Sequence, residues 1–211
     1  MLMPHEKRDN TAPIVTVKTR TPLHLDQGVT AEIVSFNGLS DDKEHIALIY
    51  PAPQGSEDKT PLVRVHSECL TGDVFGSSHC DCGDQLHEAQ SKMAAQGGIL
   101  LYLRQEGRGI GLYSKIEAYK LQHDEGLDTF AANRHLGFAD DLRDFCLAAN
   151  MLKALDIKDI RLLTNNPEKV AHMEGCGVKV TERISTGYFE KEANAHYLRA
   201  KKDHGHRFSE D

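Results

Sequence analysis

The chain has 211 residues, with 25 Lys and Arg against 32 Asp and Glu, which gives a formal net charge of −7. This length suits one domain with its own hydrophobic core. Hydrophobic residues at 39% and charged residues at 27% exclude a disordered polymer and a membrane-buried protein. The acidic balance argues against general binding to nucleic acid, which needs a basic face, but a phosphate compound needs only a local cationic pocket.

The two ends of the chain are more polar and less regularly patterned than its middle. The first residues carry no apolar segment typical of a secretory signal, and no apolar run approaches the roughly 18–20 residues of a membrane span. We therefore expect a cytoplasmic protein with a flexible start at residues 1–12. Residues 13–183 are predicted to form one catalytic domain, and residues 184–211 a charged tail that is partly helical or disordered. In that tail a helix is predicted to begin at 196–199, and 201–207 to be frayed and solvated.

The first part of the domain has the pattern of strands joined by polar turns. Short β-branched or aromatic runs at 14–18, 31–36 and 45–50 predict three strands, and Asn37 followed by Gly marks a turn between them. A further strand is predicted at 63–66, directly before the first of several clustered cysteines.

The next part alternates helix and strand signals. Apolar residues at helical spacing predict a helix over 84–96, which Gly97 ends. The continuous apolar run 99–103 is typical of a strand that is covered on both faces. Ser114 and Glu117 form a capping box, so a helix is predicted to start at Ser114.

The same alternation continues toward the C-terminus. Asp140 is predicted to cap a helix, a strand is predicted at 159–164, and Asn166 followed by Pro167 predicts the next helix start. A last strand is predicted at 178–181. Alternating helices and strands indicate a layered α/β body with a largely parallel sheet.

Three of the five cysteines lie close together, as Cys69, Cys80 and Cys82. In a reducing cytosol, clustered thiols are typical of metal ligands or catalysts rather than of disulfides. Thiolates favour zinc, whose structural sites are closed by four ligands and whose catalytic sites leave one position open. The spacing is compatible with an open catalytic site and with a closed site completed by His66 or His79.

The other two cysteines are isolated in the sequence. Cys146 and Cys176 lie in apolar, helix-like surroundings, so we expect them to be small core residues.

A glycine-rich segment, residues 104–112, follows the predicted buried strand and precedes a predicted helix. Glycines there let backbone N–H groups approach phosphates, and Arg104 and Arg108 add positive charge, although such turns are common. Glu106 has the acceptors to bind the N1–H and amino group of guanine, which adenine does not present. The alternative is that Glu106 is a solvated acid in a loop.

Two further polar groups lie near predicted helix starts. Asp141 and Arg143 follow the predicted cap, where an acid also complements the helix dipole without any other role. Thr164 and Lys169 lie between a strand end and a helix start, the edge at which open α/β sheets bind ligands.

Taken together, five segments resemble GTP cyclohydrolase II, the family that opens riboflavin biosynthesis. The longest matches read Arg64-Val-His-Ser-Glu-Cys-Leu-Thr-Gly-Asp and Arg104-Gln-Glu-Gly-Arg-Gly-Ile-Gly-Leu. The others are residues 80–83, 115–122 and 162–167, so the resemblance spans about 63–180. It implies a layered αβα body with a mixed, largely parallel sheet plus N-terminal antiparallel strands.

The resemblance also implies a reaction. GTP would be hydrolysed, with loss of guanine C8 as formate and release of pyrophosphate, to 2,5-diamino-6-(5-phosphoribosylamino)pyrimidin-4(3H)-one. Two alternatives are a paralogue that takes another nucleotide or stops at the formamide, and a non-catalytic zinc module that binds nucleotide or nucleic acid. The protein would act as a cytoplasmic homodimer with GTP as its partner, without nucleic acid or membrane.

The resemblance assigns roles to individual residues. Cys69, Cys80 and Cys82 become ligands of one catalytic zinc per subunit, and Mg²⁺ accompanies the triphosphate. Tyr119 aligns with a tyrosine needed for ring opening, Asp141 with the general acid/base, and Arg143 with a proposed nucleophile toward the α-phosphate. A guanidinium is a poor nucleophile, so charge stabilisation also explains that arginine. Residues expected around GTP are Arg64, Val65, His66, Ser67, Glu68, Gln85, Glu106, Gly107, Arg108, Thr129, Thr164 and Lys169.

Three places differ from the family pattern. His79 stands where the family usually has Arg or Lys, and Ala131 stands where it usually has an acid. The stretch 184–194 replaces a family segment rich in Asn.

Overall fold

The structure is a computed structural model that describes residues 14–26, 28–41, 43–55, 60–203 and 205–208. The predicted flexible start at 1–12 lies outside these residues. Their framework is one sheet with the strand order β1-β2-β3-β5-β4-β6-β7. The strands are β1 (Thr16–His24), β2 (Thr30–Asn37), β3 (Ile46–Tyr50), β4 (Leu62–Ser67), β5 (Gly98–Leu103), β6 (Asp159–Leu163) and β7 (Lys179–Ile184).

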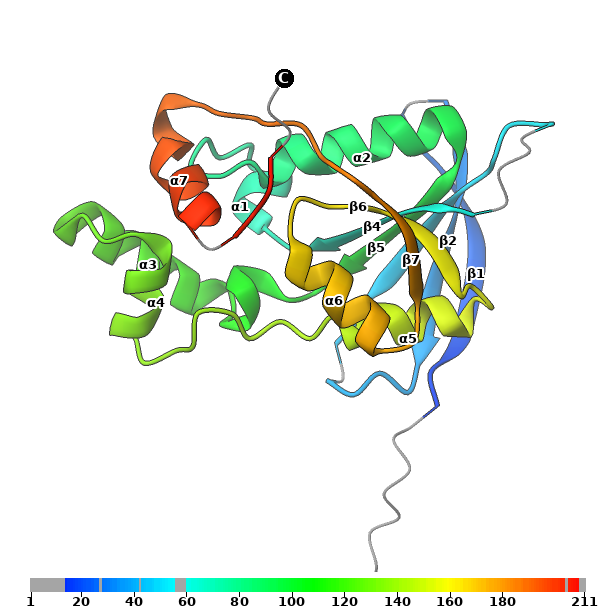
Figure 1. Cartoon of the computed structure of the whole chain (residues 1–211), viewed down its shortest axis with the longest axis horizontal. Helices are drawn as coiled ribbons and strands as arrows, with labels where there is room; N and C mark the ends of the chain where they lie inside the picture. Colours follow the sequence, from blue (N-terminus) through cyan, green and yellow to red (C-terminus); the bar gives the residue numbers. More distant parts are fainter. Residues whose placement is uncertain (1–13, 27, 42, 56–59, 204, 209–211) are drawn as a thin grey trace, which may run out of the picture.

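The sheet has an antiparallel half and a parallel half (Figure 1). The β1, β2, β3 and β5 strands pair antiparallel, whereas β5, β4, β6 and β7 pair parallel. The predicted mixed sheet with N-terminal antiparallel strands is therefore confirmed, and the N-terminal strands extend the same sheet. The parallel strands all end at one edge, where the connecting segments can place side chains together.

Helices cover both faces of the sheet and extend beyond one edge. In Figure 1, α2 lies over one face, α5 and α6 lie over the other, and α3, α4 and α7 lie past the sheet. Within the described residues, no helix has both the length and the apolar character to cross a membrane. The helices are α1 (Leu70–Asp73), α2 (Cys82–Gln96), α3 (Leu112–Glu125), α4 (Thr129–His135), α5 (Cys146–Ala154), α6 (Pro167–Gly175) and α7 (Ala195–Asp203), with short turns η1 (Glu106–Gly109) and η2 (Glu192–Asn194).

The central strand β5 contributes to the cores on both faces. Ile99, Leu101 and Leu103 pack with α5 and the residues around α6, whereas Leu100 packs with α2. The alternation follows from the two-residue period of a strand, and it confirms the prediction of a strand covered on both faces.

Three predicted helix starts are displaced, and the first is that of α2, which begins at Cys82 instead of residue 84. The helix α3 begins at Leu112 instead of Ser114, because the chain turns at Gly111 with φ 90°, a conformation that favours glycine. The helix predicted from Asp140 begins only at Cys146, where the Asp144 carboxylate accepts a hydrogen bond from the Cys146 N–H. Residues 141–144 form a loop instead.

The short helix α4 was missed by the sequence analysis. Its start carries a preferred cap, because the Asp128 carboxylate accepts a hydrogen bond of 2.8 Å from the Ala131 N–H. The predicted start of α6 is confirmed, since the Asn166 side chain caps it and Pro167 is its first residue.

The expectation that Cys146 and Cys176 are small core residues holds in part, because Cys176 packs against the core on the α5 and α6 face, but the two residues are also paired with each other. They form a disulfide with a Cα–Cα distance of 5.5 Å, and both are half-buried. The pairing arises because the start of α5 and the end of α6 meet on the same face of the sheet.

The C-terminal region is more ordered than the sequence pattern indicates. The predicted helix is present as α7, with Leu198 fully buried. The predicted solvation of the run that begins at Lys201 is wrong at that residue, because only 6% of Lys201 is exposed.

Replacing Leu101 with Ala is expected to lower the free energy of unfolding by about 2–5 kcal/mol, because it leaves a cavity beneath α5. Urea unfolding followed by circular dichroism measures the change. Ile14→Ala, at a side chain 85% exposed, is the control and should stay within about 0.5 kcal/mol. Equal effects of the two substitutions would contradict the packing described here.

Candidate active site

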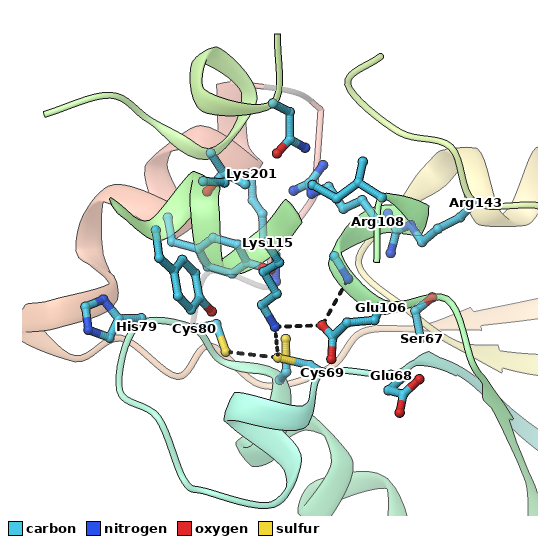
Figure 2. A pocket seen from close by; sticks show the side chains of 18 of the residues that line it. Ser67, Glu68, Cys69, His79, Cys80, Glu106, Arg108, Lys115, Arg143 and Lys201 are labelled. Atoms are coloured by element: carbon cyan, nitrogen blue, oxygen red, sulfur yellow. Dashed lines mark hydrogen bonds and ion pairs between the residues drawn. The ribbon is translucent and has the colours of Figure 1, made fainter. Parts of the chain in front are cut away.

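A cavity lies beyond the carboxyl ends of the parallel strands β4, β5 and β6. Side chains from the cysteine segment, η1, α3, α4, α6 and α7 line it together, and Figure 2 shows them from close by. This is the edge at which open α/β sheets bind ligands.

The three clustered cysteines meet at one end of this cavity. The sulfur atoms of Cys69, Cys80 and Cys82 all lie within 4.8 Å of one another, on either side of the α1 turn and at the start of α2. A Cβ atom added at Gly72 would lie 2.9 Å from Cys80 Sγ and 3.2 Å from Cys69 Sγ. Only glycine leaves room for the thiols there, and three soft thiol donors in a compact group suit zinc.

Neither candidate histidine joins the thiol group that the described residues form. The Nε2 atom of His66 lies 3.1 Å from Asp73, and the His66 ring stacks on Tyr102. Burial lowers the pKa of His66, although Asp73 opposes that shift. His79 is exposed and stacks on Tyr119, with ring centroids 5.8 Å apart. Among the described residues, the group that could hold a metal ion therefore consists of the three thiols, and whether a metal site there is open or closed stays a prediction.

A lysine that the sequence analysis left without a role connects the thiols to the glycine-rich segment. The Lys115 Nζ atom lies 3.1 Å from Cys69 Sγ and 2.7 Å from Glu106 Oε1 (Figure 2). Burial lowers the pKa of Lys115, but the Cys69 thiolate and Glu106 raise it more. Hydrogen bonds from Cys80 and Cys82, and then Lys115, hold the pKa of Cys69 below its usual value. The position of Lys115 on α3, four residues before Tyr119 and so on the same face of the helix, was the signal that could have identified this lysine.

Glu106 is buried, so the alternative of a solvated loop acid is wrong. Its carboxylate accepts hydrogen bonds from the Leu70 N–H at 2.7 Å, the Gly107 N–H at 3.0 Å and the Lys115 ammonium. A carboxylate has about four acceptor positions, so one remains at Oε2.

The glycines of this segment serve a close approach between two loops. A Cβ atom at Gly109 would lie 2.9 Å from the Leu142 Cβ, and the Leu142 N–H donates to the Arg108 carbonyl. Arg108 has φ 59°, which is uncommon for a residue with a side chain. Its guanidinium lies 4.2 Å from the centre of the Phe130 ring. The contact of Arg108 and Gly109 with Leu142 brings the loop of residues 141–144 to the cavity.

Positive charge collects at another part of the cavity wall. Arg64 donates to Gln85 at 2.6 Å, and Lys169 donates to the Val65 carbonyl at 2.9 Å. Burial, and then the positive charges of Arg64 and Arg143, lower the pKa of Lys169 well below its usual value. Because these cations repel one another, the cavity favours an anionic ligand such as a phosphate.

Asp141 and Arg143 form an ion pair at the same wall. The Asp141 carboxylate accepts from the Arg143 backbone N–H at 3.0 Å and from Nε at 2.9 Å. Burial raises the pKa of Asp141, but hydrogen bonds and charge from Arg143 lower it by more, so the net pKa lies below its usual value. Within the described residues, Arg143 lines the cavity, whereas Asp141 is not one of the lining residues and contacts Arg143.

Tyr119 lies beside the thiol group. Its hydroxyl is 3.1 Å from the Thr71 hydroxyl, which is itself 3.6 Å from Cys69 Sγ. Burial raises the pKa of Tyr119, so the phenol stays protonated at neutral pH and can donate a hydrogen bond.

Most residues predicted to contact substrate line this cavity, and two do not. Val65 contributes its carbonyl to Lys169, and the Thr164 hydroxyl accepts from the Asn166 N–H at 3.1 Å. Contact of any of them with a nucleotide stays a prediction. The predicted residues that line the cavity are Arg64, His66, Ser67, Glu68, Gln85, Glu106, Gly107, Arg108, Thr129 and Lys169. Residues that sequence reasoning missed include Lys115, Gln122, Asn133, His196, Tyr197 and Lys201.

Comparison with known proteins identifies the family. The family model described as GTP cyclohydrolase II matches residues 16–185. The chain belongs to the GTP cyclohydrolase II family. It is therefore an enzyme of the hydrolase class, as the five resembling segments imply.

Relatives in this family match nearly the whole chain. The protein is 58% identical over 177 residues to GTP cyclohydrolase-2 of Vibrio parahaemolyticus, covering 84% of this chain and 88% of the relative. It is 51% identical over 200 residues to GTP cyclohydrolase-2 of Aliivibrio fischeri strain ES114, covering 94% and 100%. It is also 51% identical to riboflavin biosynthesis protein RibBA of Bacillus mycoides, covering 89% of this chain and 47% of that protein.

In this member of the GTP cyclohydrolase II family, Lys115→Met is expected to raise the pH of the first thiol ionisation by about 1–3 units. The ammonium 3.1 Å from Cys69 Sγ stabilises the thiolate, and Met removes that charge. Ultraviolet absorbance of thiolates across pH measures the change in metal-free protein. Lys120→Met, which removes an exposed ion pair from the same helix, is the control. An unchanged ionisation in Lys115→Met would show that the ammonium does not act on the thiols.

Proposed function

We propose that this protein hydrolyses GTP to formate, pyrophosphate and 2,5-diamino-6-(5-phosphoribosylamino)pyrimidin-4(3H)-one, at the start of riboflavin biosynthesis. One observation carries the proposal: a compact group of three thiols and a cluster of buried cations line the same cavity. The first suits metal-assisted hydrolysis at a base, and the second suits a triphosphate. Membership of the GTP cyclohydrolase II family supports it.

The thiols would hold a zinc ion at the base end of the nucleotide. Cys69, Cys80 and Cys82 are its ligands in this proposal, and zinc bound there supplies a Lewis acid that activates water at neutral pH. Tyr119, protonated because burial raises its pKa, donates a hydrogen bond to charge that develops as the imidazole ring opens. Lys115 keeps Cys69 ionised as a ligand.

Glu106 is proposed to read the guanine base. The one acceptor position left at its Oε2 atom suits a single N–H of guanine. A second hydrogen bond to the base would require Lys115 or the Gly107 N–H to give up its place on Oε1. Because three protein donors already hold the Glu106 carboxylate, it is oriented before the substrate binds.

The buried cations are proposed to hold the triphosphate, together with Mg²⁺. Arg64 and Lys169 are restrained by protein acceptors, so their charges face the cavity without reorganisation. Arg143 stabilises charge on the α-phosphate as pyrophosphate leaves. Asp141 orients that guanidinium through the ion pair. Arg143 lowers the pKa of Asp141, so the carboxylate stays ionised, the form that a general base needs. We further propose that the enzyme acts as a homodimer in the cytoplasm.

The direct test is to quantify formate, pyrophosphate and the pyrimidine product together from GTP, zinc and Mg²⁺. Equal amounts of the three are expected. Cys80→Ser is expected to lower formate release by more than about 100-fold. Removing a residue that only hydrogen-bonds to a metal ligand already lowers metal affinity or activity by about 10–100-fold, and Cys80 is a proposed ligand itself. Cys176→Ser, a cysteine outside the cavity, is the control. Undiminished formate release from metal-depleted Cys80→Ser protein would refute the proposal.

Tyr119→Phe is expected to lower formate release by about 10²–10³-fold while pyrophosphate release falls much less. The phenol lies beside the thiols, where the ring opens, and Phe removes only its hydroxyl. Parallel assays of the two products under single-turnover conditions measure the difference. Tyr113→Phe, at an exposed position of the same helix, is the control. Equal loss of both products would contradict the role given to Tyr119.

A further inference from the structure

The C-terminal helix α7 is fastened to the segment that carries the clustered cysteines. Asp81 lies between Cys80 and Cys82 in the sequence and is fully buried. Lys201 of α7 forms an ion pair with its Oδ1 atom, and only 6% of Lys201 is exposed. A salt bridge this deeply buried holds its partners in one geometry, because leaving either charge alone away from water is costly.

Hydrogen bonds connect this ion pair to Arg64, one of the buried cations of the cavity. The other Asp81 oxygen, Oδ2, accepts a hydrogen bond from Gln85 Nε2 at 2.7 Å. The Gln85 Oε1 atom in turn accepts from Arg64 at 2.6 Å. A chain of polar contacts therefore leads from α7, past the cysteine segment, to an arginine proposed to hold the triphosphate.

Contacts on both sides of α7 hold the rest of the C-terminal segment. Before the helix, Lys191 pairs with Asp84 at 2.6 Å, and the Gly187 N–H donates to Glu88. After it, the Arg207 N–H donates to the Asn165 carbonyl at 2.8 Å. The Lys191 pair is partly exposed and so contributes little. The Lys201 pair is the buried one that fixes the helix to the cavity.

Helix α7 forms one wall of the cavity. Tyr197 and Lys201 line it together with residues of the cysteine segment and η1, and Figure 1 shows α7 beside α1 and the start of α2. Lys201 lies over the Tyr197 ring, 4.5 Å from its centre. This wall lies beyond residue 185, where the match to the family model ends.

We propose that Asp81 and Lys201 are positioning residues that latch α7 over the site as a cover. With the latch formed, α7 separates a bound nucleotide from bulk water and slows its escape. With the latch broken, the wall opens while the cysteines, Arg64 and Lys169 stay in place. The effect on nucleotide retention rests on the proposed function, whereas the effect on α7 itself does not.

The test compares Lys201→Met, Asp81→Asn and the double variant in the full-length, zinc-loaded protein. Without nucleotide, the amides of α7 are expected to exchange with deuterium at least about tenfold faster in each variant, with the double variant no worse than either single one. The KM for GTP is expected to rise about tenfold, with kcat falling less than about threefold. A non-hydrolysable GTP analogue should protect α7 in the wild type and much less in Lys201→Met.

Two controls separate the latch from general damage. Arg199→Met changes a cation of the same helix whose side chain contacts its own helix carbonyl, and it should leave exchange and KM unchanged. Lys201→Arg keeps the charge and is expected to restore most of the protection. Zinc content is measured throughout; if Asp81→Asn loses zinc or does not fold, Lys201→Met and its Arg counterpart carry the test.

Unchanged α7 exchange in Lys201→Met would overturn the proposal, as would strictly additive effects in the double variant. Faster exchange with unchanged KM would overturn the role in retaining nucleotide. A wild type that releases no formate from GTP, yet shows the expected exchange differences, would refute the proposed function while supporting the latch.

Discussion

The close packing of three thiols against Gly72 is the constraint on which the rest of the site depends. The space left by its missing Cβ allows Cys69, on one side of α1, to meet Cys80 and Cys82 at the start of α2. The neighbours of this group then have set places, with Lys115 and Tyr119 on α3 beside it. Because α1 and α2 follow β4 and precede β5, the parallel half of the sheet decides where the thiols stand.

The second physical theme is buried positive charge that neighbouring acids compensate only in part. Arg64 and Lys169 are buried and donate to neutral acceptors, and the charge of Arg64 adds to burial in lowering the pKa of Lys169. Such an arrangement costs stability in the empty protein and becomes favourable only when an anion enters. In the proposed function, this arrangement would favour a phosphate group at the edge of the sheet, and the C-terminal helix α7 forms part of the wall around the cavity.

Local patterns predicted several elements well. The buried strand β5 and the Asn-Pro start of α6 depend on residues next to one another in the sequence, and both were predicted. The predicted start at Ser114 was wrong because Gly111, with its positive φ, already turns the chain into α3. Asp140 was not a cap because it pairs with Arg134, while Asp144 accepts from the first N–H of the helix. Several capping residues competed, and only their tertiary partners decided which one was used.

By itself the sequence determined the α/β class, the three-cysteine group and the family, because these depend on residue type and spacing. Tertiary structure decided which residues meet. The role of Lys115, the burial of Glu106, the Cys146–Cys176 disulfide and the place of Lys201 beside Asp81 all join segments far apart in the chain. Such contacts leave no local pattern in the sequence. A charged side chain is predicted to be exposed to solvent unless its distant partner and its burial are known.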